Sequence, residues 1–193
     1  MYKILTLVGT RPEIIKLSLT IKKLDNFFDH YLVHTGQNYD YELNQIFFKD
    51  LNIRKPDYFL SSKSKNSINT IAKIFVKFDL ICEKIKPDAV IILGDTNSSL
   101  AAIVANKKKI PIFHIDDGNR CVNIDTTEEL NRKLIDNKSI YHSLYKNKFE
   151  DSIKSTLPST KKTQLFMTEY ENEITKSYVV DSWYKKSVWL YLL

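Results

Sequence analysis

Short apolar runs alternate with longer segments of helical periodicity along the first 137 residues of the chain. Each run has the length of one buried strand of a parallel sheet, and the clearest is the aliphatic run at 89–93. Between the runs, apolar residues recur at helical spacing, which is typical of helices that pack one face against a sheet. The pattern predicts strands at 3–8, 30–35, 58–60, 89–93 and 110–115, and helices at 14–24, 41–50, 67–86 and 96–106.

This order of elements is that of an α/β fold. Strand–helix–strand units join parallel strands through right-handed crossovers, so the pattern predicts a Rossmann-like parallel sheet with flanking helices. The composition then changes: the last alanine is Ala105, the last glycine is Gly118, and both tryptophans lie in the last 11 residues. We therefore predict a Rossmann-like domain at 1–137 and a divergent tail at 138–193 that packs poorly against it.

Composition and charge narrow the class of protein. The chain has 193 residues, a hydrophobic fraction of 43% and a net charge of +6. Its basic residues are scattered, with the longest run at 107–109, so we expect a solvated surface and no nucleic-acid partner. No apolar run approaches the ~20 residues that cross a bilayer, and no signal peptide is recognisable, so we expect no membrane partner. Cys82 and Cys121 lack a CxxC spacing, which indicates a reducing cytoplasm and argues against a zinc site.

Polar clusters follow four of the predicted strands, at the edge where open α/β sheets bind their ligands. After the first strand comes the segment 9–13 (GTRPE), with Lys16 one turn further on. A strand–glycine–helix junction presents backbone N–H groups, and with Arg11 and Lys16 it favours a bound phosphate. The alternative is a simple turn with surface charges. The segment matches neither GxGxxG nor a Walker A loop.

The second cluster is 36–40 (GQNYD), which offers Gln37 and other polar groups to a sugar or a base. The alternative is a turn that caps the next helix. The third cluster is 94–97 (GDTN), where Asp95 directly follows a strand and is suited to acid–base chemistry. A helix N-cap at Asp95 or Thr96 is the alternative.

The fourth cluster is 114–120 (HIDDGNR), which is followed by 128–132 (EELNR). One histidine and two aspartates could suggest a metal site, but a matching set of ligands is missing, so we expect no metal. From the residues alone, the adjacent Glu128 and Glu129 are typical of the acidic first turn of a helix. Cys121 is expected to be a packed side chain rather than a nucleophile.

Taken together, the four clusters resemble the non-hydrolysing UDP-N-acetylglucosamine 2-epimerase family, over roughly residues 3–136. Several ordered motifs at consistent spacing are far more specific than one. The GQNYDYELN and GNRC variants look most like the branch that acts on UDP-linked 2-acetamido-2,6-dideoxy sugars. The motifs are GTRPEIIKL at 9–17, TGQNYDYELNQ at 35–45, GDTNSSLAA at 94–102, HIDDGNRC at 114–121 and EELNRKLID at 128–136.

The resemblance implies two similar Rossmann-like domains with an active site in the cleft, and a UDP-linked 2-acetamido sugar as substrate. A base would remove the C2 proton, UDP would leave from C1, and UDP would then return with C2 inverted, without a redox cofactor or metal. Such an enzyme serves the synthesis of capsule or O-antigen precursors. The implied catalytic residues are Asp95, Asp116 and Glu128, and the implied substrate-binding residues are Arg11, Lys16, Gln37, Arg120 and Arg132.

The sequence departs from the family pattern in three respects. A catalytic glutamate is replaced by Asp116, which is one methylene shorter, and the proline of the family's PEE motif is Thr127. The resemblance stops near residue 136, and the family's second domain is not found. We therefore expect a truncated epimerase that is inactive alone and acts as a homodimer or with a separately encoded second half. The alternative is an inactive remnant or a weak UDP-sugar binding module.

Overall fold

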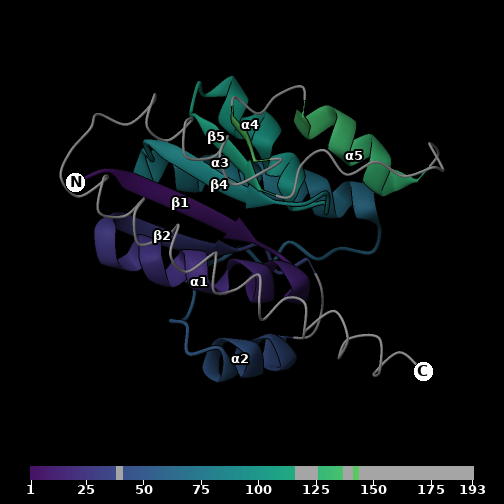
Figure 1. The fold of residues 1–193 in the computed structure, drawn as a ribbon. Coiled ribbons are helices and arrows are strands. Elements are labelled where there is room, and N and C mark those ends of the chain that lie inside the picture. The colour runs from purple at the N-terminus through teal and green to yellow at the C-terminus, as the bar shows by residue number, and fades with distance from the viewer. Residues whose placement is uncertain (38–40, 116–125, 137–140, 144–193) are drawn as a thin grey trace. The chain divides into compact units, whose positions relative to one another are not determined.

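The computed structural model describes residues 1–37, 41–115, 126–136 and 141–143 (Figure 1). All described elements belong to one compact unit, Met1–Phe149. Its sheet has the order β3-β2-β1-β4-β5-β6, and all neighbouring strands are parallel. The strands are β1 (Lys3–Val8), β2 (Asp29–His34), β3 (Tyr58–Phe59), β4 (Ala89–Leu93), β5 (Ile112–Ile115) and β6 (Tyr141–Ser143). The predicted α/β fold with a parallel, Rossmann-like sheet is confirmed.

Helices cover both faces of the sheet (Figure 1). One face carries α1 and α2, which pack Ile14, Leu17 and Phe48 against the strands. The other face carries α3, α4 and α5, and its core contains the fully buried Phe78 and Ile135. The helices are α1 (Arg11–Phe27), α2 (Tyr41–Asp50), α3 (Ser67–Ile85), the 3₁₀ turn η1 (Ser99–Ala101), α4 (Ala102–Lys107) and α5 (Thr127–Asp136). Among the described residues, no helix combines the length and the apolar character needed to cross a membrane.

Two elements differ from the sequence-based expectation. The helix predicted at 96–106 is divided into η1 and the short α4. The hydroxyl of Ser99 donates to the carbonyl of Leu93 at 2.9 Å and so ties the start of η1 to the end of β4. A 3₁₀ turn is frequent at the amino end of an α-helix. Strand β6, which pairs with β5, was not predicted. It lies beyond residue 137, so the sheet continues past the expected domain boundary, which stays a prediction.

A charged network joins α1, β2 and the loop before β3. Asp25 Oδ1 lies 2.6 Å from His30 Nδ1 and accepts a hydrogen bond from Arg54 Nε at 2.8 Å. Arg54 also bonds Asp57 Oδ2 at 2.6 Å, and His30 Nε2 lies 2.8 Å from the hydroxyl of Thr6. Burial opposes ionisation of Asp25, but the hydrogen bonds from His30 and Arg54 outweigh it and lower the pKa of this carboxyl group.

We expect Asp25→Asn to lower the free energy of unfolding by about 2 kcal/mol at neutral pH, because charged hydrogen bonds are lost. The lowered pKa means that the stabilisation is present above the pKa of the unfolded chain and is lost as the pH falls through the folded value. The difference between the two proteins should therefore narrow below about pH 4, as measured by urea unfolding. The control is Asp50→Asn at the exposed end of α2. A difference that stays constant down to about pH 2 would contradict the assignment.

Candidate functional site

Three loops meet at the carboxyl edge of the sheet, where β1, β2 and β4 end. Gly9 follows β1 and packs directly against Thr35, after β2, and Ser98, in the loop after β4. A Cβ at Gly9 would lie 1.9 Å from Ser98 Oγ and 2.4 Å from Thr35 Oγ1. These two hydroxyl oxygens are 2.7 Å apart and buried. A glycine is therefore required at this position for the three loops to approach one another.

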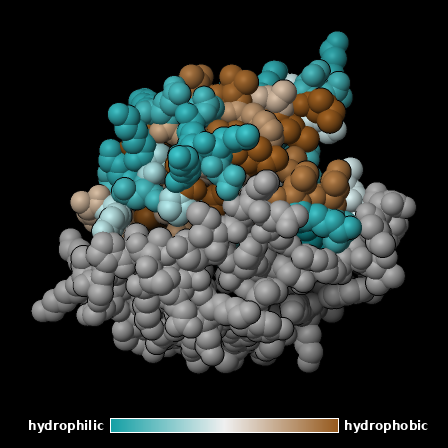
Figure 2. Space-filling model, turned by 90° about the horizontal axis from the view of Figure 1, so that it is seen from above, coloured by the Kyte–Doolittle hydropathy of each residue, from teal (hydrophilic) through white to brown (hydrophobic). Residues whose placement is uncertain are grey.

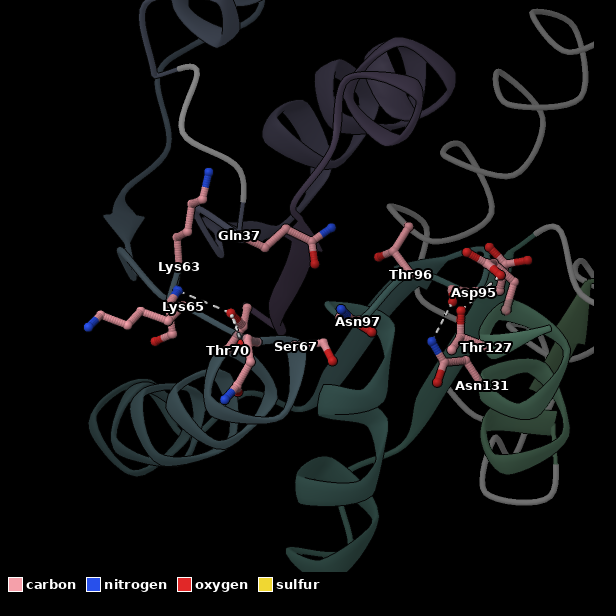
Figure 3. A pocket seen from close by; sticks show the side chains of 13 residues that line it. Gln37, Lys63, Lys65, Ser67, Thr70, Asp95, Thr96, Asn97, Thr127 and Asn131 are labelled. Atoms are coloured by element: carbon pink, nitrogen blue, oxygen red, sulfur yellow. Dashed lines mark hydrogen bonds between the residues drawn. The ribbon is translucent and has the colours of Figure 1, made fainter. Parts of the chain in front are cut away.

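A pocket of about 420 Å³ opens beside this junction (Figure 3). Figure 3 shows Gln37 on one side and Asp95, Thr127 and Asn131 on the other, with Asn97 between them. The amino groups of the lining lysines point away from its centre. Polar side chains from four segments of the chain thus surround the pocket. The lining residues are Gln37, Lys63, Ser64, Lys65, Asn66, Ser67, Thr70, Asp95, Thr96, Asn97, Thr127, Glu128 and Asn131.

Gln37 enters the pocket from the turn after β2. His34 Nδ1 accepts a hydrogen bond from the N–H of Gly36 at 3.0 Å, and burial lowers the pKa of His34 to about 4, so this ring is neutral. Gly36 has φ +62°, and a Cβ there would lie 2.7 Å from the Phe59 ring, so only glycine fits. Gln37 Oε1 is buried without a hydrogen-bond partner in the described part of the chain, as is Ser64 Oγ. Both oxygens can therefore bond a polar ligand.

Asp95 reaches the pocket from the turn after β4. Its carboxylate forms an ion pair with Arg132, and its backbone carbonyl accepts a hydrogen bond from Asn131 Nδ2 at 2.9 Å. Thr96, one of the two residues considered as a cap, accepts a hydrogen bond from the N–H of Ser98 at 3.2 Å. Asp95 and Arg132 were predicted as site residues in segments that lie far apart in the sequence, and the structure brings their side chains into contact.

The two adjacent glutamates of α5 have different environments. Glu128 is exposed and lines the pocket, where it accepts a hydrogen bond from the Thr127 hydroxyl at 3.0 Å. Glu129 is buried and lies 3.2 Å from Arg132 Nη1. Arg132, predicted to bind substrate, therefore contacts two carboxylates of the protein. Both glutamates lie in the first turn of α5, as the sequence indicated, and Glu128 lines the pocket. Its catalytic role stays a prediction.

Glu13 is an organising residue that the sequence analysis did not single out. Its Oε2 accepts hydrogen bonds from the N–H groups of Gly9 and Thr10, and its Oε1 accepts one from the Thr96 hydroxyl at 2.6 Å. Glu13 is only 2% exposed, and burial outweighs these bonds and raises the pKa of its carboxyl group. The Thr10-x-x-Glu13 spacing of a capping box was the available signal, but the link to Thr96 spans 83 positions.

The β1–α1 junction differs from the expected phosphate site. Two of the N–H groups thought to be available there, those of Gly9 and Thr10, already bond Glu13, and Pro12 has none. The side chains of Arg11 and Lys16 are exposed and do not line the pocket. The Arg11 guanidinium lies 5.8 Å from the centre of the Phe47 ring. Binding of a phosphate by these two cations stays a prediction.

Two further predicted residues, Asp116 and Arg120, lie outside the described residues. The cysteine of the same segment, Cys121, also lies there. Within the described ranges, no group of three or more His, Cys, Asp or Glu side chains is placed to hold a metal ion.

Comparison with known proteins places this geometry in a family. The family model described as UDP-N-acetylglucosamine 2-epimerase matches residues 22–160. The UDP-N-acetylglucosamine 2-epimerase of Methanocaldococcus jannaschii is 40% identical over 141 residues, which are 72% of this chain and 38% of the relative. The UDP-2,3-diacetamido-2,3-dideoxy-D-glucuronate 2-epimerase of Pseudomonas aeruginosa is 39% identical over 140 residues, which are 71% of this chain and 40% of the relative. The chain thus spans about two fifths of the length of the curated relatives it matches.

Solved structures agree. The UDP-N-acetylglucosamine 2-epimerase of Rickettsia bellii superposes with a TM-score of 0.70 at 45% identity, over 94% of this chain and 51% of that one. The M. jannaschii UDP-GlcNAc 2-epimerase in complex with UDP-GlcNAc and UDP superposes with a TM-score of 0.69 at 33% identity, over 88% of this chain and 43% of that one. The resemblance seen in the sequence motifs is confirmed, and the chain belongs to the UDP-N-acetylglucosamine 2-epimerase family.

Proposed function

We propose that the pocket at the carboxyl edge of the sheet binds a UDP-linked 2-acetamido sugar and that the protein acts as a UDP-sugar 2-epimerase. The observation that carries the proposal is the pocket itself, in which Asp95, Glu128 and the unpaired oxygen of Gln37 lie together. Family relatives support the substrate class, because the Methanocaldococcus jannaschii and Neisseria meningitidis enzymes have been solved with UDP-GlcNAc bound.

The proposed reaction balances without an electron acceptor. A base removes the proton at C2, the C1–O bond breaks, and UDP leaves with the electron pair, so that a C1–C2 double bond forms. UDP then re-adds at C1 while C2 is protonated on the opposite face. Asp95 and Glu128, which line the pocket, are proposed as acid–base groups, because both proton transfers require groups positioned beside C2. Asp116 is proposed as a third such group. The elimination and re-addition are redox neutral, so we propose no cofactor.

The remaining residues are assigned by chemistry. Gln37 Oε1 is proposed to accept a hydrogen bond from a sugar hydroxyl or the acetamido N–H, which would satisfy its buried oxygen. Arg11, Lys16 and Arg120 are proposed to bind the diphosphate, because cations stabilise the charge on the leaving UDP. The proposed sugar of the substrate is a 2-acetamido-2,6-dideoxy sugar. The proposed role is the synthesis of capsule or O-antigen precursors, and the proposed location is the cytoplasm.

Titration of the chain with UDP tests the site. We expect Arg11→Ala to weaken binding by about tenfold or more, because a charge-assisted contact contributes about 1.5–3 kcal/mol. Isothermal titration calorimetry would measure it. Lys107→Ala, at the exposed carboxyl end of α4, is the control and should bind as the wild type does. Equal affinities for wild type and Arg11→Ala would place the phosphate elsewhere.

A UDP-sugar binding module is the second candidate function. The described lining of the pocket favours it, because it offers two carboxylates, Asp95 and Glu128, whereas the family reaction needs acid–base groups on both faces of C2. Incubation with UDP-N-acetylglucosamine in deuterated water, followed by NMR, separates the two functions. Binding without deuterium at C2 supports the module. Deuterium incorporation that Asp95→Asn abolishes supports the epimerase.

We propose that the protein forms a homodimer through the exposed face of α3. Hydrophobic side chains reach the surface of the described part of the molecule (Figure 2). On α3, Ile68, Val76 and Leu80 are 71%, 64% and 58% exposed, and with the exposed Ala72 they follow one another at four-residue spacing. A two-fold axis through Val76 would place Ala72 of one copy against Leu80 of the other. This small-to-large match is the self-complementarity that a symmetric dimer requires.

We expect the purified chain to have about twice its monomer mass of 22.6 kDa in light scattering after size exclusion. Val76→Asp should shift the protein to the monomer, because it places an unpaired charge at the centre of the apolar face. The control is Lys107→Asp on the exposed end of α4. A monomeric wild type that associates only when a separately encoded second half is supplied would contradict the homodimer.

A further inference from the structure

The turn that carries Asp95 is held by side chains from three other elements. His114 Nε2, at the end of β5, lies 2.7 Å from the carbonyl oxygen of Gly94. Asn131 Nδ2, in α5, donates to the carbonyl of Asp95 at 2.9 Å (Figure 3), and Glu13, in α1, accepts from the hydroxyl of Thr96 at 2.6 Å. Three successive residues of the turn are therefore fixed one by one, and the backbone of Asp95 has little freedom.

The carboxylate of Asp95 is held separately, through Arg132. One guanidinium nitrogen of Arg132 pairs with Asp95 Oδ2, and a second lies 3.2 Å from Glu129 Oε2. A guanidinium is planar and presents five donors, so it can bridge two carboxylates in one fixed orientation. Glu129 is 2% exposed, and its buried carboxylate therefore orients Arg132, which in turn orients Asp95.

We propose that Arg132 is a positioning residue for Asp95, set by Glu129, and not a ligand of the substrate phosphates; this rests on the proposed function of the site. Charge supports the assignment, because the guanidinium of Arg132 already pairs with two carboxylates of the protein, Asp95 and Glu129, whose negative charges oppose an approaching diphosphate. Geometry supports it as well, because separate guanidinium nitrogens of Arg132 contact Glu129 and Asp95, and Asp95 lines the pocket. Helix α5 thus contributes Thr127, Glu128 and Asn131 to the pocket lining. Its Glu129 and Arg132, together with Asn131, support Asp95.

Binding measurements separate a positioning residue from a phosphate ligand. Arg132→Met is expected to weaken binding of UDP-N-acetylglucosamine about tenfold, a fold-change that matches the usual coupling between contacting side chains. The same substitution should leave the affinity for UDP within about twofold of the wild type. Arg132→Lys keeps the charge but lacks the planar fork that fixes the orientation of both carboxylates, so it should bind more like Arg132→Met than like the wild type. In the Asp95→Asn background the same substitutions should have no further effect. A tenfold loss of UDP affinity in Arg132→Met, rescued by Arg132→Lys, would overturn the proposal.

A second measurement needs no ligand, so it stands even if the chain binds no UDP-sugar. In ¹⁵N NMR spectra of the free protein, the guanidinium protons of Arg132 should exchange at least about tenfold more slowly than those of the exposed Arg11. Glu129→Gln and Asp95→Asn should each remove this protection while the backbone spectrum shows an intact fold. Fast exchange in the wild type, or protection unchanged by both substitutions, would overturn the positioning role. Failure of UDP-sugar binding alone would instead reject the proposed function.

Discussion

Replacing Phe78 by alanine is expected to lower the free energy of unfolding by about 4 kcal/mol, because the substitution removes a large buried ring and leaves a cavity. Phe78 has no exposed surface and lies in α3, in the core formed with β1, β4 and α4. Protein interiors are close-packed, so its neighbours can fill only part of the lost volume. Urea unfolding followed by circular dichroism would measure the change.

The matched control is Lys73→Ala, five residues earlier on the exposed side of the same helix. It tests helix propensity without touching the core, and a surface change of this kind should stay within about 0.5 kcal/mol of the wild type. A loss below about 2 kcal/mol for Phe78→Ala would contradict the packing described for this face of the sheet.

The fold could be predicted because burial on a parallel sheet leaves a local trace in the sequence. Strand β4 is buried along its whole length and matches the aliphatic run at 89–93. Helix α3 ends one residue before its predicted end, and its buried residues, such as Ile74 and Phe78, recur at four-residue spacing. The parallel order followed from the alternation of the two patterns.

What could not be predicted depends on contacts between distant segments. Strand β6 has only three residues, too few for a readable alternation, and it forms by pairing with β5. The family match extends to residue 160, past the boundary predicted at 137. The 3₁₀ turn at the start of the helix predicted at 96–106 lies where the Ser99 hydroxyl bonds the end of β4, a contact that a hydrophobic pattern does not record.

The candidate site shows the same division. The rule that ligands bind beyond the carboxyl ends of strands predicted a common location for Gln37, Asp95 and Glu128, and these three line one pocket. The rule could not predict that Arg132 would pair with Asp95, since side-chain partners are set by the packing of α5. It also missed Glu13, whose capping-box spacing is local but whose bond to Thr96 is not.

Glu13 and Asp25, both on α1, respond to pH in opposite directions. Burial disfavours the charged form of both carboxyl groups. The hydrogen bonds from His30 and Arg54 outweigh burial and lower the pKa of Asp25, whereas burial prevails and raises the pKa of Glu13. A raised pKa in the folded state means that the folded protein binds the proton more tightly than the unfolded chain. The contribution of Glu13 to stability is therefore present below the pKa of the unfolded chain and is lost as the pH rises through the folded value.

Glu13→Ala is expected to lower the free energy of unfolding by about 3 kcal/mol, because it leaves the N–H groups of Gly9 and Thr10 without their acceptor and removes a helix cap. Glu13→Gln should stay within about 1 kcal/mol of the wild type at neutral pH. The amide oxygen can accept both N–H groups, its nitrogen can donate to the Thr96 hydroxyl, and no charge is buried.

The pH dependence of stability separates the contribution of the hydrogen bonds of Glu13 from that of its charge. Urea unfolding from about pH 4 to pH 8 should show the stability of the wild type falling relative to Glu13→Gln as the pH rises, because only the wild type must ionise a buried carboxyl group. Glu128→Gln, which changes an exposed glutamate of α5, is the control and should follow the wild type. If Glu13→Gln is as unstable as Glu13→Ala, the loops after β1 and β4 need a carboxylate at this position, and the hydrogen-bond geometry alone does not hold them together.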